Sequence, residues 1–409
     1  MNIYSIIILA TIIIGYFLDF FGDYLNLKAL KPELPEEFKD VYDADKYQKS
    51  QEYTRVTTRF GFITDLFNLI ILLGFWFLGG FNYLDKFVRG FELNSILTGL
   101  VYIGLLLFLK MILGIPFSIY STFVIEERFG FNKTTAKIFI MDLIKSLILG
   151  AVLGGIVLGA ILLFFEYTGD WAWLYAWVIS VAFIFIMQII FPTVIMPLFN
   201  KFTPLEEGEL RDKIMAFAGK SEFPLDNIYI MDGSKRSSKS NAFFTGLGKT
   251  KRIALFDTLV NNHSPDELVA ILAHEIGHYK KKHVLTGTVI GIIHSGIMFY
   301  LLSIFLSHKG LFDAFYMDQI SVYTGLIFFG LLYSPVELIL SIFLGMLSRH
   351  NEYQADTFAA EHVDDKGAVI NALKNLAKDN LSNLTPHPFY VFLNYSHPPV
   401  LDRIKKIKQ

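Results

Sequence analysis

The sequence predicts a mainly helical membrane protein with seven transmembrane helices and a small α/β domain outside the bilayer. Of its 409 residues, 53% are hydrophobic and 18% are charged, whereas soluble domains carry about 25% charged residues. The mean hydropathy is +0.45. The apolar residues gather in long runs, and the only extended polar regions are 201–283 and 349–409. Composition and patterning therefore favour a multi-pass membrane protein.

Seven apolar runs are long enough to cross a bilayer. A spanning helix needs about 20 apolar residues, because each backbone polar group must be satisfied inside the segment. The runs are residues 1–18, 66–84, 93–125, 146–165, 171–200, 284–308 and 319–348. The first run lacks the basic start and the cleavage site of a signal peptide, so we expect it to be retained as a transmembrane helix.

These runs divide the chain into four segments. Residues 1–200 hold the first five transmembrane helices, and 284–348 hold the sixth and seventh. The polar segments 201–283 and 349–409 are expected to form two parts of one domain. In the first part, "DNIYIMD", "NAFFTGL" and "KRIALFD" predict strands, since they are β-branched and aromatic runs bounded by turn residues. We interpret "GSKRSSKS" (233–240) as a mobile loop.

Basic residues in the short loops predict the orientation in the membrane. If the amino terminus faces outside, the inside loops (28–55 and 128–137) hold nine Lys and Arg residues against three in the outside loops (86–89 and 309). Cytoplasmic loops carry an excess of such residues. Both polar segments are therefore predicted to lie on the cytoplasmic side, where they can share one site.

Charge and cysteine content exclude several function classes. The formal net charge of -2 provides no basic field for nucleic acid, so we expect no nucleic-acid partner. With no cysteine, the chain has no disulfide framework, no thiolate nucleophile and no thiolate metal ligand. A metal site must then use His, Glu, Asp or water.

The stretch "ILAHEIGHYKKKH" (271–283) contains a candidate metal site. His274 and His278 are four residues apart, so on a helix they project from one face. Ser264 and Glu267 predict the start of that helix as a capping box. Such a pattern arises by chance in about one chain in a hundred, and the alternative is a pair of surface histidines.

A third ligand would decide between these readings. Glu352 and Asp356 lie just beyond the last apolar run at the same four-residue spacing. Glu352 can complete a set of two nitrogens and one oxygen, as in catalytic zinc sites of the gluzincin type, which predicts one zinc ion per chain. Asp356 would fix the tautomer of a zinc-binding histidine. The alternative for these two acids is a solvated helix face.

The predicted chemistry is peptide hydrolysis. Glu275 lies between the two histidines, where it can act as the general base that takes a proton from the attacking water and returns it to the leaving amine. The negative oxygen that develops on the substrate needs further donors. His397 and Arg403, which flank a Pro-Pro turn, are candidates, and the alternative is an exposed loop with a basic terminal helix.

Together these segments resemble the type 1 CAAX prenyl protease family of integral-membrane zinc metalloproteases. The resemblance covers nearly the whole chain and rests on "HEIGH" (274–278), "SRHNEYQAD" (348–356), "SNAFFTGL" (240–247), "IEERFGFNKTT" (125–135) and "SHPPVLDRI" (396–404). It implies that His274, His278 and Glu352 hold zinc and that Glu275 is the general base. Asp356 would support the site.

The resemblance also implies how a substrate binds. Asn241, Ala242 and Phe243 would belong to an edge strand to which a peptide adds by backbone hydrogen bonding. His397 and Arg403 would contact the substrate or the developing oxyanion. The expected substrate is a peptide or protein, prenylated or otherwise associated with the membrane, that is cut near its carboxyl end. The sequence gives no oligomeric state.

The family further implies helices that enclose a water-filled intramembrane chamber. Ionisable residues within or beside the apolar runs agree with this, because uncompensated charge in a bilayer is costly. They are Asp65, Lys110, Asp142, Lys145, His294 and Glu337. They must face protein or water, and the alternative to a chamber is a packed bundle with intramembrane salt bridges.

Two features bear on the cellular setting. The carboxyl terminus "RIKKIKQ" lacks the extended tail with an endoplasmic-reticulum retrieval signal that eukaryotic family members tend to have. The absence of cysteine and the richness in Ile, Lys and Phe also favour a bacterial inner membrane, with the endoplasmic reticulum expected for a eukaryotic source. A bacterial cell would leave the CAAX substrate in question, but not the peptidase chemistry.

Two other functions remain open at this point. One is a quality-control protease that cuts misfolded membrane proteins without regard to a carboxyl-terminal motif. The other is a transporter or scaffold with structural zinc, which the sequence disfavours because structural sites usually have four protein ligands, commonly with cysteine. The charged "YKKKH" after the motif disfavours an intramembrane site-2 type protease.

Overall fold

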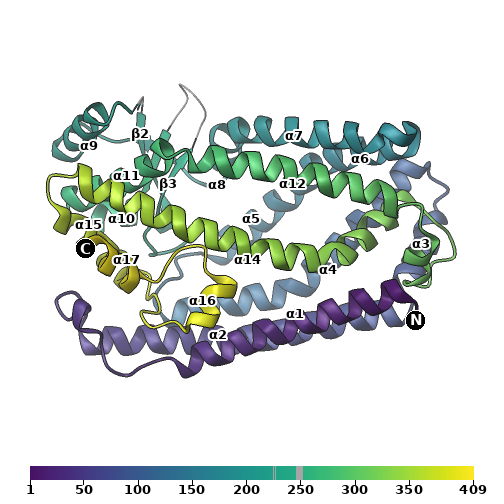
Figure 1. Cartoon of the computed structure of the whole chain (residues 1–409), viewed down its shortest axis with the longest axis horizontal. Coiled ribbons are helices and arrows are strands. Elements are labelled where there is room, and N and C mark those ends of the chain that lie inside the picture. Colours follow the sequence, from purple (N-terminus) through teal and green to yellow (C-terminus); the bar gives the residue numbers. More distant parts are fainter. Residues whose placement is uncertain (224, 226, 246–251) are drawn as a thin grey trace.

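The structure, a computed structural model, describes residues 1–223, 225, 227–245 and 252–409. Within them, seven helical segments are long and apolar enough to cross a membrane, which confirms the predicted number. Figure 1 shows these segments running along the long axis of the molecule, with the sheet at the end opposite the amino terminus. The segments are Ile3–Lys28 (α1), Ala44–Phe77 (α2), Ser95–Glu126, Ala136–Tyr167, Gly169–Phe199, His283–Phe305 (α12) and Val322–His362 (α14).

Three of these segments contain π-helical turns. The third continues α4 (Ser95–Tyr120) through such a turn. The fourth joins α5 (Ala136–Leu149) to α6 (Gly155–Tyr167), and the fifth joins α7 (Ala172–Ile190) to α8 (Met196–Phe199). Because the helix direction persists through each turn, each segment spans as one unit.

The observed helices differ from the apolar runs at their ends. The predicted run 66–84 crosses the end of α2, because Gly79 adopts a left-handed φ of 73° and starts the amphipathic α3 (Gly80–Arg89). The predicted division at residue 348 falls inside α14, which has 41 residues. The change from apolar to polar composition there marks a change of surroundings along one continuous helix.

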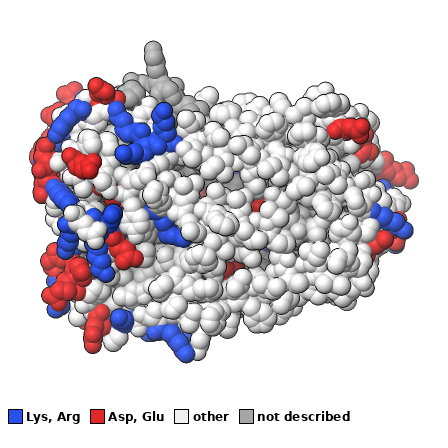
Figure 2. All heavy atoms as spheres, viewed as in Figure 1, with Lys and Arg blue, Asp and Glu red and all other residues white. Residues whose placement is uncertain are grey.

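Charged side chains gather at the two ends of the molecule, and the band between them is nearly free of charge in the view of Figure 2. Several ionisable residues of the spans have protein partners. The Lys145 Nζ donates to the Leu198 carbonyl at 2.7 Å, and His294 Nε2 lies 3.2 Å from Glu337 Oε1. Asp65 and Lys110 are exposed. The contacts of Lys145, His294 and Glu337 agree with the expectation that such residues face protein or water.

The extramembrane unit, residues 201–282 and 349–409, contains a four-stranded sheet. Its strands are β1 (Phe202–Pro204), β2 (Asn227–Met231), β3 (Ala242–Thr245) and β4 (Arg252–Phe256), in the order β1-β2-β4-β3. Strands β2 and β4 are parallel, and the other two pairs are antiparallel. The three predicted strands are confirmed, although Gly246 and Leu247 of the predicted second segment lie outside the described residues. Among the strands that the structure describes, β3 forms one edge of the sheet.

The segment 233–240 is anchored, so its interpretation as a mobile loop is wrong. Arg236 forms two hydrogen bonds with Asp142 of α5, at 2.7 and 2.9 Å. The Lys133 amide donates to the Arg236 carbonyl, and the Ser238 amide donates to the Phe131 carbonyl, both at 3.0 Å. The Arg236 side chain thus binds the segment to α5, and the backbone of the segment binds the loop that precedes α5.

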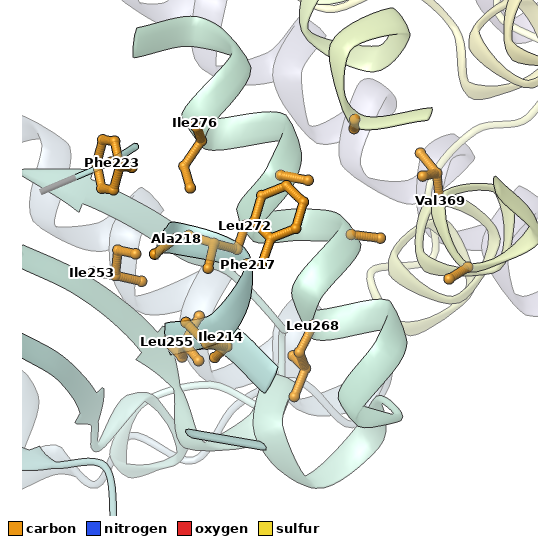
Figure 3. Close-up of a cluster of buried hydrophobic side chains, with 14 of the residues drawn as sticks. Ile214, Phe217, Ala218, Phe223, Ile253, Leu255, Leu268, Leu272, Ile276 and Val369 are labelled. Carbon is orange, nitrogen blue, oxygen red and sulfur yellow. The ribbon is translucent and has the colours of Figure 1, made fainter. Parts of the chain in front are cut away.

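Helix α11 (Pro265–Lys280) packs on the sheet through one face. Leu268, Leu272 and Ile276 recur every four residues and share that face. Figure 3 shows it directed at β4 and at α9 (Glu209–Lys220). Its partners are Ile214, Phe217, Ala218, Ile253 and Leu255. Burial of each large apolar side chain stabilises the fold by about 1.5–3 kcal/mol, which fixes α11 in place.

The remaining helices cover the ends of the molecule and the site. Helices α15 (Lys366–Asp379) and α17 (Val400–Lys408) pack against each other, and both contribute residues to the core beneath α11. Short helices complete the chain: α10 (Asp257–Asn262), α13 (Lys309–Asp313) and α16 (Pro388–Asn394). Segments before and after the last span thereby join in one unit.

Candidate active site

Helix α11 presents the two predicted histidines on the face opposite its core face. The capping box is present, with the Glu267 amide donating to Ser264 Oγ and the Ser264 amide donating to Glu267 Oε2, both at 3.3 Å. His274 and His278 each follow a core residue by two positions, about 200° around the helix. The face that packs on the sheet therefore directs both imidazoles away from it.

A glycine lets α14 approach this face. A Cβ atom at Gly277 would lie 3.1 Å from the Cα atom and the carbonyl oxygen of Ala355, and 3.2 Å from the Cβ of Phe358. Ala355 is fully buried. The close contact of the two helices brings Glu352, one turn before Ala355 on α14, over the histidines.

His274, His278 and Glu352 form a compact set of ligand atoms. These atoms lie within 4.8 Å of one another. The two histidine Nε2 atoms are 3.1 Å apart, and the Glu352 oxygens lie 3.4 and 3.2 Å from them. The buried Oε2 of Glu352 accepts no hydrogen bond from any residue that the structure describes. A cation at this point would satisfy it, and two imidazoles with one carboxylate match the ligands of catalytic zinc.

Asp356 and Arg403 hold the outer side of His274. The His274 Nδ1 lies 2.9 Å from Asp356 Oδ1, and Arg403 donates from Nε and a terminal nitrogen to the same carboxylate at 2.8 and 2.6 Å. Burial alone would lower the pKa of His274, but hydrogen bonds to Asp356 and Glu352 raise it to about 9. The ionised Asp356 carboxylate thus holds the Nδ1 side of the ring, which leaves Nε2 directed at Glu352.

Most of the predicted site residues line one pocket. It is lined by His274, Glu275, Glu352, Asp356, His397, Arg403, Asn241 and Ala242, among others. His397 is mostly exposed, with its Nε2 3.3 Å from Glu352 Oε1. Phe243 is not part of this lining, because neighbouring side chains of a strand point to opposite faces. Its ring packs edge-on against Phe256.

The residues just before β3 are held by hydrogen bonds and an ion pair to two different parts of the molecule. The Ser240 amide donates to Asn380 Oδ1 and the Asn380 amide donates to the Ser240 carbonyl, both at 3.1 Å. On the other side, the Lys239 Nζ lies 2.9 Å from Glu126 Oε2 and 2.8 Å from the Tyr53 hydroxyl. The edge strand is therefore tied to the spanning helices.

Comparison with known proteins agrees with this architecture. The family model described as CAAX prenyl protease N-terminal, five membrane helices, matches residues 23–201, and the peptidase family M48 model matches residues 204–409. The chain is 36% identical to CAAX prenyl protease 1 of Saccharomyces cerevisiae, over 92% of this chain and 89% of that protein. The chain belongs to the CAAX prenyl protease 1 family.

Further family members show the same extent of similarity. The Arabidopsis thaliana CAAX prenyl protease 1 homolog is 36% identical over 97% of this chain and 95% of its own. The crystal structure of S. mikatae Ste24p superposes with a TM-score of 0.94 at 34% identity and covers 100% of both chains. As a member of the CAAX prenyl protease 1 family, the chain is a multi-pass membrane metalloprotease.

Sequence reasoning missed three contributors to this site. Gly277 was overlooked because only the packed structure reveals the helix that approaches it. His283 lies beside His278 and Gln354 lies beside His283, but the turn between α11 and α12 that brings His283 there has no glycine to signal it. For His283, the available signal was a third histidine within "HEIGHYKKKH".

Proposed function

We propose that this protein is a zinc endopeptidase that cleaves near the carboxyl end of prenylated or membrane-associated polypeptides. The observation that carries the proposal is the convergence of His274, His278 and Glu352 beside a pocket that is lined by His274, Glu352, Glu275 and the start of the edge strand β3. The described residues offer three ligands and not four, which favours a catalytic over a structural ion.

Each residue of the pocket has a role that its position supports. His274, His278 and Glu352 would hold zinc, which supplies a Lewis acid that polarises water and the scissile carbonyl. Glu275 takes a proton from the attacking water and transfers it to the leaving amine. Asp356 holds the His274 ring through its Nδ1. His397 and Arg403 supply donors for the developing negative charge on the substrate.

Strand β3 supports the binding of an extended peptide. In the described part of the sheet, β3 pairs with β4 on one side only, so its other edge offers backbone donors and acceptors. A peptide added there would run beside Asn241 and Ala242, which line the same pocket as Glu275. The Phe243 side chain faces away, so its contribution is through the backbone.

The membrane setting supports a membrane-associated substrate. The relatives carry the name CAAX prenyl protease 1, and the site lies on α14, the last spanning helix. We infer that the extramembrane unit lies on the cytoplasmic side, from the excess of Lys and Arg in the inside loops. A hydrated intramembrane chamber and a bacterial inner-membrane location are further parts of the proposal.

The test is cleavage of matched carboxyl-terminal peptides, farnesylated and unmodified, by the purified detergent-solubilised protein. We expect cleavage of the farnesylated peptide only, and its loss in Glu275→Gln with zinc retained. Equal cleavage of both peptides would instead favour quality control of membrane proteins. Full turnover by Glu275→Gln would contradict the proposed mechanism.

A further inference from the structure

A row of three polar side chains starts at His278, on the side of its ring away from Glu352. Its Nδ1 lies 3.0 Å from Nδ1 of His283. His283 Nε2 lies 3.0 Å from Oε1 of Gln354, and Gln354 Nε2 lies 2.9 Å from Nε2 of His350. The row joins α11, the first residue of α12 and α14.

The backbone between α11 and α12 builds this contact. Lys282 has a left-handed φ of 61°, which is uncommon for a residue with a side chain. Its amide donates to the Tyr279 carbonyl at 2.9 Å, closing the turn. The turn places the His283 ring against His278, with 5.1 Å between ring centroids and 75° between the ring planes.

Hydrogen bonds along the row can be donated in two directions, and only one of them leaves Nε2 of His278 free to bind a metal. An amide oxygen only accepts, so Gln354 Oε1 accepts from the Nε2 proton of His283. A neutral His283 then has an unprotonated Nδ1, which accepts the Nδ1 proton of His278. The Nε2 lone pair of His278 stays free, and this atom faces Glu352 at 3.2 Å.

The reverse direction would block metal binding. If Gln354 donated to His283 Nε2, then His283 Nδ1 would carry the proton and donate to His278 Nδ1. A neutral His278 would then carry its own proton on Nε2, the atom directed at His274 and Glu352. The contact at the end of the row is consistent with the first direction. The amide nitrogen of Gln354 donates a hydrogen bond, and an unprotonated Nε2 of His350 accepts it.

We propose that His283, held by Gln354, is a positioning residue for the metal. It accepts the Nδ1 proton of His278 and so fixes the tautomer and the ring orientation of that ligand. The two histidine ligands are then supported differently: His274 by the charged pair of Asp356 and Arg403, and His278 by neutral side chains. The inference rests on the proposed metal site and extends it by two residues.

The experiment compares His283→Phe with His283→Asn in the full-length, detergent-purified protein. Phe keeps a ring but removes the acceptor, whereas Asn places an acceptor oxygen near the position of Nδ1. Zinc affinity is measured by competition with a chelator, and the ligand geometry by the visible absorption of the Co²⁺-substituted protein. We expect Phe to weaken zinc binding by about 10–100-fold and to change the Co²⁺ spectrum, and Asn to recover most of both.

Two further variants separate this effect from a general loss of structure. Gln354→Leu is expected to weaken zinc binding in the same direction as His283→Phe, and His350→Leu to change it little, because His350 is exposed. If His283→Phe folds and binds zinc like the wild type, the proposal is overturned while the metal site stands. If Phe does not fold, wild-type zinc binding by Gln354→Leu overturns it. If the wild type binds no zinc, or His274→Ala binds it equally well, the metal site itself fails.

Discussion

Arg236 and Asp142 form a bidentate ion pair that joins the extramembrane unit to the fourth spanning segment. Two nitrogens of Arg236 lie 2.7 and 2.9 Å from the Asp142 carboxylate, and one of them also donates to the Phe199 carbonyl at 2.8 Å. About a quarter of each side chain is exposed. The ion pair thereby holds the segment between β2 and β3 against α5 and the end of the fifth spanning segment.

Removal of Arg236 should destabilise the protein. Arg236→Met leaves the Asp142 carboxylate without its partner inside a spanning segment, and hydrogen bonds to charged groups contribute about 1.5–3 kcal/mol each. We expect a lower thermal midpoint in detergent, which Asp142→Leu in the same chain partly restores. Lys235→Met is the control, because Lys235 is exposed. An equal loss in the control would show that the effect is not due to the ion pair.

Gly277→Ala should disturb the metal site through helix packing. The added Cβ would press on the Ala355 backbone at 3.1 Å, and such overpacking costs about 1–3 kcal/mol. Because α14 carries Glu352, we expect weaker zinc binding as well as lower stability. Gly287→Ala on α12 is the matched control, since its Cβ meets nothing within 4 Å. Both are measured by chelator competition and thermal unfolding.

Lys239→Met should raise the KM for peptide substrates more than it lowers kcat. Lys239 contacts Glu126 and the Tyr53 hydroxyl and lies 4.5 Å from the centre of the Phe131 ring. It precedes Asn241 by two residues, so its loss should loosen the edge strand and not the metal ligands. We expect a change of about 5–30-fold in KM, consistent with about 1–2 kcal/mol of lost interaction.

Two comparisons test whether Lys239→Met acts through the edge strand. Lys239→Arg keeps the charge and should recover part of the lost affinity, and zinc content should be the same in all three proteins. A fall in kcat at constant KM would instead place the effect at the reacting groups.

The protein should lose stability as the pH falls below neutral, and His263 should contribute to this loss. The His263 ring is fully buried and lies 3.0 Å from Glu267 Oε2. Burial lowers its pKa, although Glu267 and Asp379 act in the opposite direction. The folded state therefore favours neutral His263, and its contribution is present above the unfolded pKa of about 6.5 and is lost as the pH falls toward the lower folded value.

The measurement is the thermal midpoint between about pH 8 and about pH 5.5, where histidine titrates. His263→Gln cannot titrate, so its midpoint should fall less over this range than that of the wild type. Parallel curves for the two proteins would show that His263 does not contribute.

The parts of the fold that follow from local patterns were predictable. Apolar runs gave the seven spans, and the capping box at Ser264 gave the start of α11. The metal ligands followed from spacing, because His274 and His278 share a helix face whatever surrounds them. Their geometry is confirmed in the described structure, while their roles stay proposals.

The parts that depend on contacts between distant segments were not predictable. Arg236 looked like a loop residue because its partner Asp142 lies 94 positions away. The turn at Lys282 has no glycine to indicate its left-handed φ, so the third histidine of the stretch was visible in the sequence but its contact with His278 was not. The last apolar run stops at residue 348, inside α14, because composition indicates what surrounds a helix and not where its backbone hydrogen bonds end.

The length of α14 has a consequence for how this protease can be divided. Glu352 and Asp356 lie near one end of a helix whose other end holds Tyr323, bonded to Asp85 at the opposite side of the molecule. One proposed metal ligand thus lies on the same helix that crosses the bilayer. The extramembrane unit therefore cannot be separated from the membrane part without loss. Excising it as a soluble fragment would cut α14, the helix that carries one of the three proposed metal ligands. Proteolytic separation of the last span should abolish the site even if the sheet and α11 survive intact.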